Sequence, residues 1–156
     1  MTLFKSLCAA ALLVPVVSFA QNAEFTNPQS IHKPFGYTHV VSVPANQKMV
    51  FISGQLGISQ EGKLVGKPGD FKAQAQQAFQ NLDTALKAVG AKWEHVVKIN
   101  MYLTDVKTQL PLLRDVRDSF VNTQNPPAST TVQIPRLVTD GALFEIDATV
   151  IMPESK

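Results

Sequence analysis

The stretch PASTTVQI (residues 127–134), followed after a short loop by LFEIDATV (residues 143–150), decides the fold of this chain. Both segments are rich in β-branched residues, and apolar and polar residues alternate along the second, which is typical of strands. One face of the second segment carries only apolar side chains, namely Phe144, Ile146, Ala148 and Val150. We therefore expect strands over about 128–135 and 143–151, with the apolar face of the last strand packed under helices.

Upstream of these strands, apolar residues recur at helical spacing. They are Phe71, Ala75, Ala78, Phe79, Leu82 and Leu86. Asp70 is a good N-cap, and Gly90 is a good residue just beyond a helix end, so the pattern predicts a helix between them. A strand over 96–104 and a second helix over about 108–121 follow, with Pro111 tolerated in the first turn of that helix.

The first part of the domain is predicted to be a β-hairpin. Residues 39–43 and 48–53 are rich in β-branched and aromatic residues, and residues 44–47 supply turn chemistry. Residues 21–35 show no period, which indicates a loosely attached arm. The predicted order is ββαβαββ in a single domain over residues 36–152, an α+β fold with both helices on one face of the sheet.

The other face of the predicted sheet is polar, but not uniformly so. Tyr102, Leu143 and Ile151 lie on it among acidic and hydroxyl side chains. Such a mixed face suits a subunit interface with water-accessible pockets. The alternative is an ordinary antiparallel sheet with one face in solvent.

The start of the chain has the features of a secretory signal peptide over residues 1–20. Lys5 gives a positive start, residues 7–17 are almost wholly apolar, and Ser18-Phe19-Ala20 offers small residues before a cleavage site. We expect a mature chain that begins at Gln21 and is exported to a bacterial periplasm, with an uncleaved membrane anchor as the alternative. The single cysteine, Cys8, lies in this leader, so the mature chain has no thiol for a disulfide, a nucleophile or a metal.

The charge balance limits the partners. The formal net charge is +2, and the sequence contains no run of Lys or Arg. We therefore expect neither nucleic acid nor a membrane surface as a partner of the mature protein. The three histidines, His32, His39 and His95, lack the spacing of a metal site, so no metal is expected.

Several segments, in the right order, resemble the RidA (YjgF) family. Besides the terminal strand pair they are 35–37, 51–55, 61–65, 74–82, 96–98 and 102–105. The resemblance covers residues 34–151 and implies a chorismate-mutase-like domain with a mixed sheet. It also implies homotrimers with small-metabolite clefts at the subunit interfaces, and no metal or organic cofactor. The best-known enzymes of that family hydrolyse reactive imines and enamines to a 2-oxo acid and ammonia.

The resemblance also implies site residues. Glu145 matches the acid associated with water activation and is the catalytic candidate. Tyr37 matches a tyrosine that lines the cleft, and Gly54 matches a glycine beside it, where a missing Cβ lets backbone amides approach a ligand. Ser129 stands where the family pattern Pro-Ala-Arg-Ser/Thr has its substrate-binding arginine, and Thr130 follows as a further substrate-binding candidate. Tyr37 of one protomer and Glu145 of its neighbour are expected to enclose a shared cavity.

The serine at position 129 leaves two functions open. Serine offers one neutral donor where a guanidinium offers a rigid charged fork. We therefore expect a binding protein or a member of altered specificity, with an imine or enamine deaminase as the alternative. Lys98 either replaces the missing cation or pairs with an acid on a neighbouring strand. Asp147, two residues from Glu145, is expected to be structural.

Overall fold

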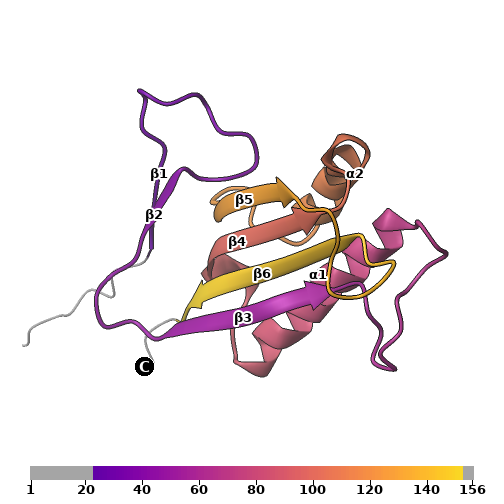
Figure 1. Ribbon diagram of the computed structural model, residues 1–156. Coiled ribbons are helices and arrows are strands. Elements are labelled where there is room, and N and C mark those ends of the chain that lie inside the picture. Colours follow the sequence, from indigo (N-terminus) through magenta and orange to yellow (C-terminus); the bar gives the residue numbers. More distant parts are fainter. Residues whose placement is uncertain (1–22, 153–156) are drawn as a thin grey trace, which may run out of the picture.

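The computed structural model describes residues 23–152, so the expected signal peptide lies outside the described residues. Two helices cover one face of a four-stranded sheet and leave the other face open (Figure 1). The elements are β1 (Glu24–Thr26), β2 (Val40–Ser42), β3 (Met49–Leu56), α1 (Phe71–Ala88), the 3-10 helix η1 (Trp93–His95), β4 (Val96–Leu103), α2 (Val106–Asp118), β5 (Ala128–Gln133) and β6 (Phe144–Ile151).

The four-stranded main sheet is mixed. Its strand order is β3-β6-β4-β5. β6 runs antiparallel to both of its neighbours, β3 and β4, whereas β4 and β5 are parallel. Helices on one face of a mixed sheet make an α+β fold, so the predicted fold class is confirmed.

The first helix, α1, begins and ends where its sequence predicts. The Asp70 side chain accepts a hydrogen bond from the Ala73 backbone N–H at 3.1 Å. Gly90 follows the helix with φ of 74°, the left-handed conformation that glycine adopts without strain. The apolar stripe of α1 packs on β3 and β6, and it builds the core with Phe144 and Ile146. No helix within residues 23–152 is long and apolar enough to cross a bilayer.

The second helix, α2, starts earlier than predicted. Asp105 caps it, because one carboxylate oxygen accepts from the Lys107 backbone N–H at 3.1 Å and the other from the Thr108 hydroxyl at 2.6 Å. Pro111 therefore lies in the second turn rather than in the first. A proline there lacks the N–H that would bond to the Lys107 carbonyl, but its side chain is exposed, so the apolar side of α2 still reaches the core.

The predicted hairpin between residues 39–43 and 48–53 is wrong. β2 pairs instead with β1, with Phe25 opposite Val41, so the predicted arm contains a strand. This two-stranded ribbon lies apart from the main sheet (Figure 1). The connection after β2 contains Pro44 and a left-handed Asn46, and it is longer than the two-residue turns that hold two strands in register. The chain therefore leaves the edge of β3 free of β2.

Candidate functional site

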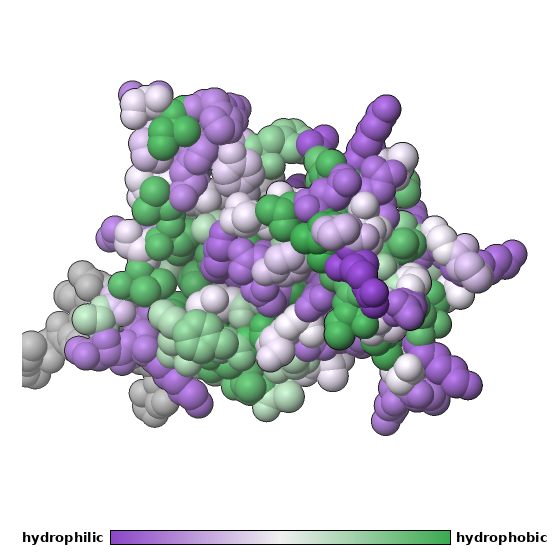
Figure 2. Space-filling model, in the orientation of Figure 1, coloured by the Kyte–Doolittle hydropathy of each residue, from purple (hydrophilic) through white to green (hydrophobic). Residues whose placement is uncertain are grey.

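A polar cluster occupies the open face of the main sheet across β4 and β6. At its centre, Asp147 accepts hydrogen bonds from Asn100 Nδ2 at 2.8 Å and from the Tyr102 hydroxyl at 3.1 Å. One bond goes to each carboxylate oxygen, so Asp147 is held by the neighbouring strand. The surface view shows a hydrophilic band on this face, with hydrophobic side chains below it over β3 (Figure 2). Asp147 thus links β6 to β4 within the cluster.

Glu145 lies two residues from Asp147 on the same face of β6, but its carboxylate has no partner. It is half-buried, and no hydrogen bond or ion pair to it exists within residues 23–152. Burial, and secondly the negative charge of Asp147, raise the pKa of Glu145 above its ordinary value. A carboxyl with a raised pKa and both oxygens available is suited to accept and return a proton.

Gly54 forms the floor beneath the Glu145 carboxylate. The pairing of β3 with β6 shifts between Ile52 and Gln55, so that β3 carries one residue more than β6 across this step. This β-bulge brings the Gly54 backbone against Glu145. A Cβ at position 54 would stand 2.8 Å from the Glu145 Cδ, so a side chain there would displace the carboxylate. The bulge and the missing Cβ together leave the space that the Glu145 carboxylate occupies.

Lys98 and Thr130 complete the polar cluster on the side of β5. The Lys98 ammonium donates to the Thr130 hydroxyl at 2.5 Å and makes no ion pair within the described part of the chain. Burial lowers the pKa of Lys98, and the charge of Asp147 opposes this effect. Burial, together with the hydrogen bond to Asp147, raises the pKa of the Tyr102 hydroxyl. The polar cluster therefore combines the Lys98 cation with the nearby Asp147 carboxylate, and Glu145 lies two residues along β6 from Asp147.

Ser129 faces the other side of the sheet. In the parallel register of β4 and β5, Ser129 pairs with Ile99, whereas Thr130 pairs with Asn100. Paired residues point to the same side of a sheet, and Ile99 is buried in the core. Thr130 therefore belongs to the polar cluster, whereas Ser129 does not. This separation was not visible in the sequence, because it depends on which strand β5 joins and in which register.

Tyr37 belongs to a different group, near the N-terminal ribbon. Its hydroxyl lies 2.9 Å from His32 Nε2, and its ring meets the edge of the His39 ring with the centroids 5.2 Å apart. The two histidine rings also contact each other, although their spacing in the sequence did not suggest it. Within residues 23–152 no group of three acidic, cysteine or histidine residues suits a metal ion. No contact joins Tyr37 to Glu145 in one chain.

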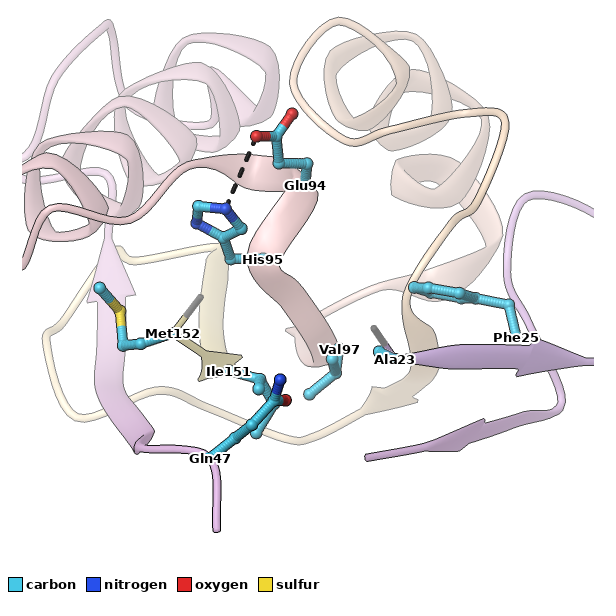
Figure 3. Close-up of a pocket in the computed structure, with 8 residues that line it drawn as sticks. All are labelled: Ala23, Phe25, Gln47, Glu94, His95, Val97, Ile151 and Met152. Carbon is cyan, nitrogen blue, oxygen red and sulfur yellow. Dashed lines mark ion pairs between the residues drawn. The ribbon is translucent and has the colours of Figure 1, made fainter. Parts of the chain in front are cut away.

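Two depressions lie near the main sheet. A hollow of about 240 Å³ opens where β6 ends and β4 begins. Figure 3 shows the residues that line it. Phe25 from β1, Gln47 and Ile151 line it, and so does His95, whose Nε2 lies 3.6 Å from Glu94 Oε1. A broader groove of about 760 Å³ runs from Gly54 along α1. Of the predicted site residues, only Gly54 borders either depression.

The fold and this site can be compared with known proteins. The model of the family described as Endoribonuclease L-PSP matches residues 28–152. The chain belongs to the RidA (YjgF) family. A RutC family protein of Aquifex aeolicus is 42% identical over 89 residues, which cover 56% of this chain and 69% of that protein. The 2-iminobutanoate/2-iminopropanoate deaminase of Dermatophagoides farinae is 33% identical over 123 residues, covering 77% of this chain and 89% of the deaminase.

Solved structures of RidA-family proteins share the architecture. The protein YyfB of the conserved Rid family from Yersinia pestis, a protein of unknown function, superposes with a TM-score of 0.72 at 26% identity, over 85% of this chain and 100% of that one. RidA from an Antarctic Psychrobacter superposes with a TM-score of 0.61 at 29% identity, over 82% of this chain and 98% of that one. The expected family and its fold are therefore confirmed.

Reasoning from the sequence missed two members of the polar cluster in this RidA-family chain. Asn100 and Tyr102 hold Asp147 in place, yet neither was named as a site residue. The signal was present, because both lie on the polar side of an alternating strand. The sequence did not show which acid these two residues would contact. The register of β4 and β6 sets the pairing of Asn100 with Asp147 and of Tyr102 with Glu145.

Proposed function

We propose that this RidA-family protein hydrolyses the carbon–nitrogen double bond of a small imine, or of the enamine that tautomerises to it. One observation carries the proposal. The Glu145 carboxyl is half-buried, has a raised pKa and no partner, and rests on the bare backbone of Gly54. The similarity to the 2-iminobutanoate/2-iminopropanoate deaminase of Dermatophagoides farinae supports the reaction class.

In this reaction Glu145 moves protons between water and the imine nitrogen. The carboxylate takes a proton from water while the water oxygen bonds to the imine carbon, and it passes that proton to the nitrogen. The resulting carbinolamine gives its hydroxyl proton to the same carboxylate, which returns it to the departing amine as the carbon–nitrogen bond breaks. One water is consumed, and a carbonyl compound and ammonia leave. A carboxyl whose pKa is shifted towards neutrality serves both transfers.

Ser129 restricts the substrate class. Its side chain is neutral, so the position at which the family pattern has its substrate-binding arginine supplies no cation. Removing one charged partner from a desolvated site costs about 2 to 5 kcal/mol, or roughly thirtyfold to several thousandfold in affinity. We therefore propose that imines without a carboxylate are better substrates than free 2-imino acids.

The proposed active assembly is a homotrimer whose clefts lie between protomers. Phe51 on the open face of β3 is 75% exposed, and Met49 on the same face is 45% exposed. Apolar side chains on a sheet face are suited to burial against a second subunit. In such a trimer Tyr37 of one protomer completes the cavity around Glu145 of the next. Native mass spectrometry at micromolar concentration should show three chains, and a monomer would contradict this assembly.

Export to a bacterial periplasm is proposed from the sequence of residues 1–20. Expression of the whole chain in a Gram-negative host should yield a periplasmic protein whose intact mass corresponds to a start at Gln21. The variant Leu13→Arg interrupts the apolar run and should keep the protein in the cytoplasm. An uncleaved chain in the membrane fraction would favour an anchor instead.

Ammonia release tests the proposed hydrolysis. The mature chain is mixed with freshly generated imines, one a neutral imine and one the 2-imino acid of the same carbon skeleton. We expect faster release than in buffer, with the neutral imine preferred, and a return to the buffer rate for Glu145→Gln. Glu61→Gln is the matched control, since Glu61 is exposed, its carboxylate accepts from the Ser59 hydroxyl, and it is not part of the polar cluster. Turnover no faster than buffer for every imine would refute the proposal.

A second candidate function is a non-catalytic small-metabolite-binding protein, which Ser129 favours because the usual anchor for a substrate carboxylate is absent. In that case a metabolite panel should raise the melting temperature of the wild type without any release of ammonia. Glu145→Gln would then weaken binding at most modestly, because an acid that transfers no proton is only one contact among several.

A further inference from the structure

A third cavity lies at the end of α2, outside the polar cluster of the sheet. Its volume is about 190 Å³. The wall residues that matter here are Phe35, Gly36, Arg117, Asp118, Thr123 and Pro126. Arg117 is only 6% exposed, so its charge is almost wholly withdrawn from water. Neither Glu145 nor any other member of the polar cluster contributes to this cavity.

The guanidinium of Arg117 is incompletely paired. Its Nε donates to Asp118 Oδ1 at 2.7 Å. Nη2 also lies 2.7 Å from that oxygen, but not in line for a hydrogen bond, and this buried atom has no hydrogen-bond partner within the described residues. An arginine fork normally engages both oxygens of a carboxylate with two nitrogens. Arg117 therefore keeps N–H donors that the chain itself does not satisfy.

The charges of this pair are also unequally solvated. The Arg117 side chain is 8% exposed, whereas the Asp118 side chain is 45% exposed. Water screens the exposed carboxylate more than the buried guanidinium, so Asp118 does not fully offset the charge of Arg117. A buried guanidinium nitrogen that no protein acceptor meets in line calls for a further acceptor, such as a water or a bound group.

The walls of the cavity are built around the guanidinium. Gly36 has φ of 72°, and a Cβ there would stand 2.7 Å from the Arg117 Cζ, so only glycine lets the backbone lie on the face of this group. Thr38 fixes the same segment, because its hydroxyl donates to the Pro126 carbonyl at 2.6 Å. The Phe35 ring lies under the Arg114 guanidinium at 5.2 Å. Arg117 is one of the residues that line the cavity, so it borders the space in which a ligand would lie.

We propose that this cavity binds a small monocarboxylate through Arg117. A planar carboxylate matches the in-plane N–H groups of a guanidinium. A monoanion meets less repulsion from Asp118 than a dianion such as phosphate does. The volume accommodates a ligand of a few carbon atoms, and the hydroxyl of Thr123 lies among the lining residues as a further donor. This inference goes beyond hydrolysis at Glu145 and does not depend on it.

Titration of the mature protein with simple anions tests this site. Acetate, propanoate, sulfate and phosphate are added at constant ionic strength, and amide shifts in ¹H–¹⁵N spectra are followed together with the Arg117 Nε signal. We expect saturable shifts at Gly36 and Arg117 with the carboxylates, and weaker effects of the dianions. Arg117→Gln should weaken carboxylate binding about tenfold or more, because a charged donor is lost.

Two controls separate this site from other effects. Arg136→Gln removes an exposed arginine that pairs with Asp140 and should leave binding unchanged, and Glu145→Gln should do the same. If Arg117→Gln fails to fold, the amide shifts of the wild type still show whether a carboxylate binds at Gly36 and Arg117. No saturable shift at Arg117 and Gly36, equal binding by the Arg117→Gln variant, or binding of sulfate and phosphate alone would each overturn the proposal.

Discussion

The Glu145 carboxylate lies against the backbone of Gly54, at the place where any other residue would carry its Cβ. Gly54 does not have a positive φ, so backbone conformation is not what demands glycine there. The crowding comes from the far end of the flexible Glu145 side chain. Position 54 therefore determines where the acid sits, rather than whether the strand forms.

Gly54→Ala should separate activity from stability. The added methyl group displaces the Glu145 carboxylate, which can rotate away, so the free energy of unfolding should change by less than about 1 kcal/mol. Ammonia release should fall by about tenfold to a hundredfold, because misplacing a reacting group by about 1 Å has effects of this order. Urea unfolding and the imine assay measure the two quantities. Full activity of the variant would show that the position of the Glu145 carboxylate does not affect the reaction.

Gly57→Ala should have the opposite profile. A Cβ at position 57 would stand 2.5 Å from the Gln74 Cα and carbonyl oxygen in α1, and backbone cannot rotate away. We expect a loss of stability of about 1 to 3 kcal/mol, the usual range for overpacking. Thermal unfolding measures it, with Gly54→Ala as the matched comparison. Equal stability of the two variants would contradict the distinction between side-chain and backbone obstruction.

Glu145→Gln should change how stability depends on pH. The pKa of Glu145 is raised above 4.5, so the folded chain holds this proton at pH values where the unfolded chain has released it. Stability therefore falls as pH rises from about 4.5 through the folded-state pKa, and the variant should lack this fall. Urea unfolding at closely spaced pH values measures the difference.

Glu61→Gln is the control of opposite sign for that experiment. The Ser59 hydroxyl, as the main cause, lowers the pKa of Glu61, so its contribution to stability is present above 4.5 and is lost as pH falls through the folded-state pKa. The same direction of change in both variants would indicate that Glu145 does not titrate as proposed.

Asp147→Asn should lower the pKa of Glu145. The change removes the negative charge that, after burial, holds this pKa up, and the amide oxygen can still accept a hydrogen bond from Tyr102. Burial remains, so the pKa should stay above the ordinary value. Carbon-detected titration of the Glu145 carboxyl measures the shift. An unchanged pKa would mean that burial alone sets it.

Gln74→Leu should destabilise the fold. Gln74 is 2% exposed, its Nε2 donates to the Gly141 carbonyl at 3.1 Å, and its Oε1 accepts from the Leu143 N–H at 2.8 Å. Leucine leaves both backbone groups without a partner, which costs about 1 to 3 kcal/mol for each group that stays dry. Thermal unfolding checks this, with Gln80→Leu on the exposed face of α1 as the control.

The parts of the fold that depend on local chemistry could be predicted from the sequence. The bounds of α1 follow from the cap at Asp70 and the left-handed Gly90, and the apolar face of β6 follows from strict alternation. The hairpin prediction was wrong because β2 pairs with β1 rather than with β3, the strand that follows it. Without an Asn-Gly type of turn, the chain between Val43 and Lys48 does not hold two strands together.

The site could be predicted only in part, for a similar reason. Glu145 and Gly54 were named from the resemblance, and the structure brings them into contact. The face of the sheet on which Ser129 lies could not be predicted, because it follows from the pairing of Ser129 with Ile99 in the parallel β4–β5 pair. The cavity at Arg117 could not be predicted either, because the segment around Gly36 that covers the guanidinium is far away in the sequence.

The departure of β2 leaves the outer edge of β3 unpaired by any strand within residues 23–152. An unpaired strand edge can pair with strands of other chains, and the exposed Phe51 on the same strand favours such aggregation. Fibrils and precipitates should therefore form first in preparations in which this edge stays uncovered.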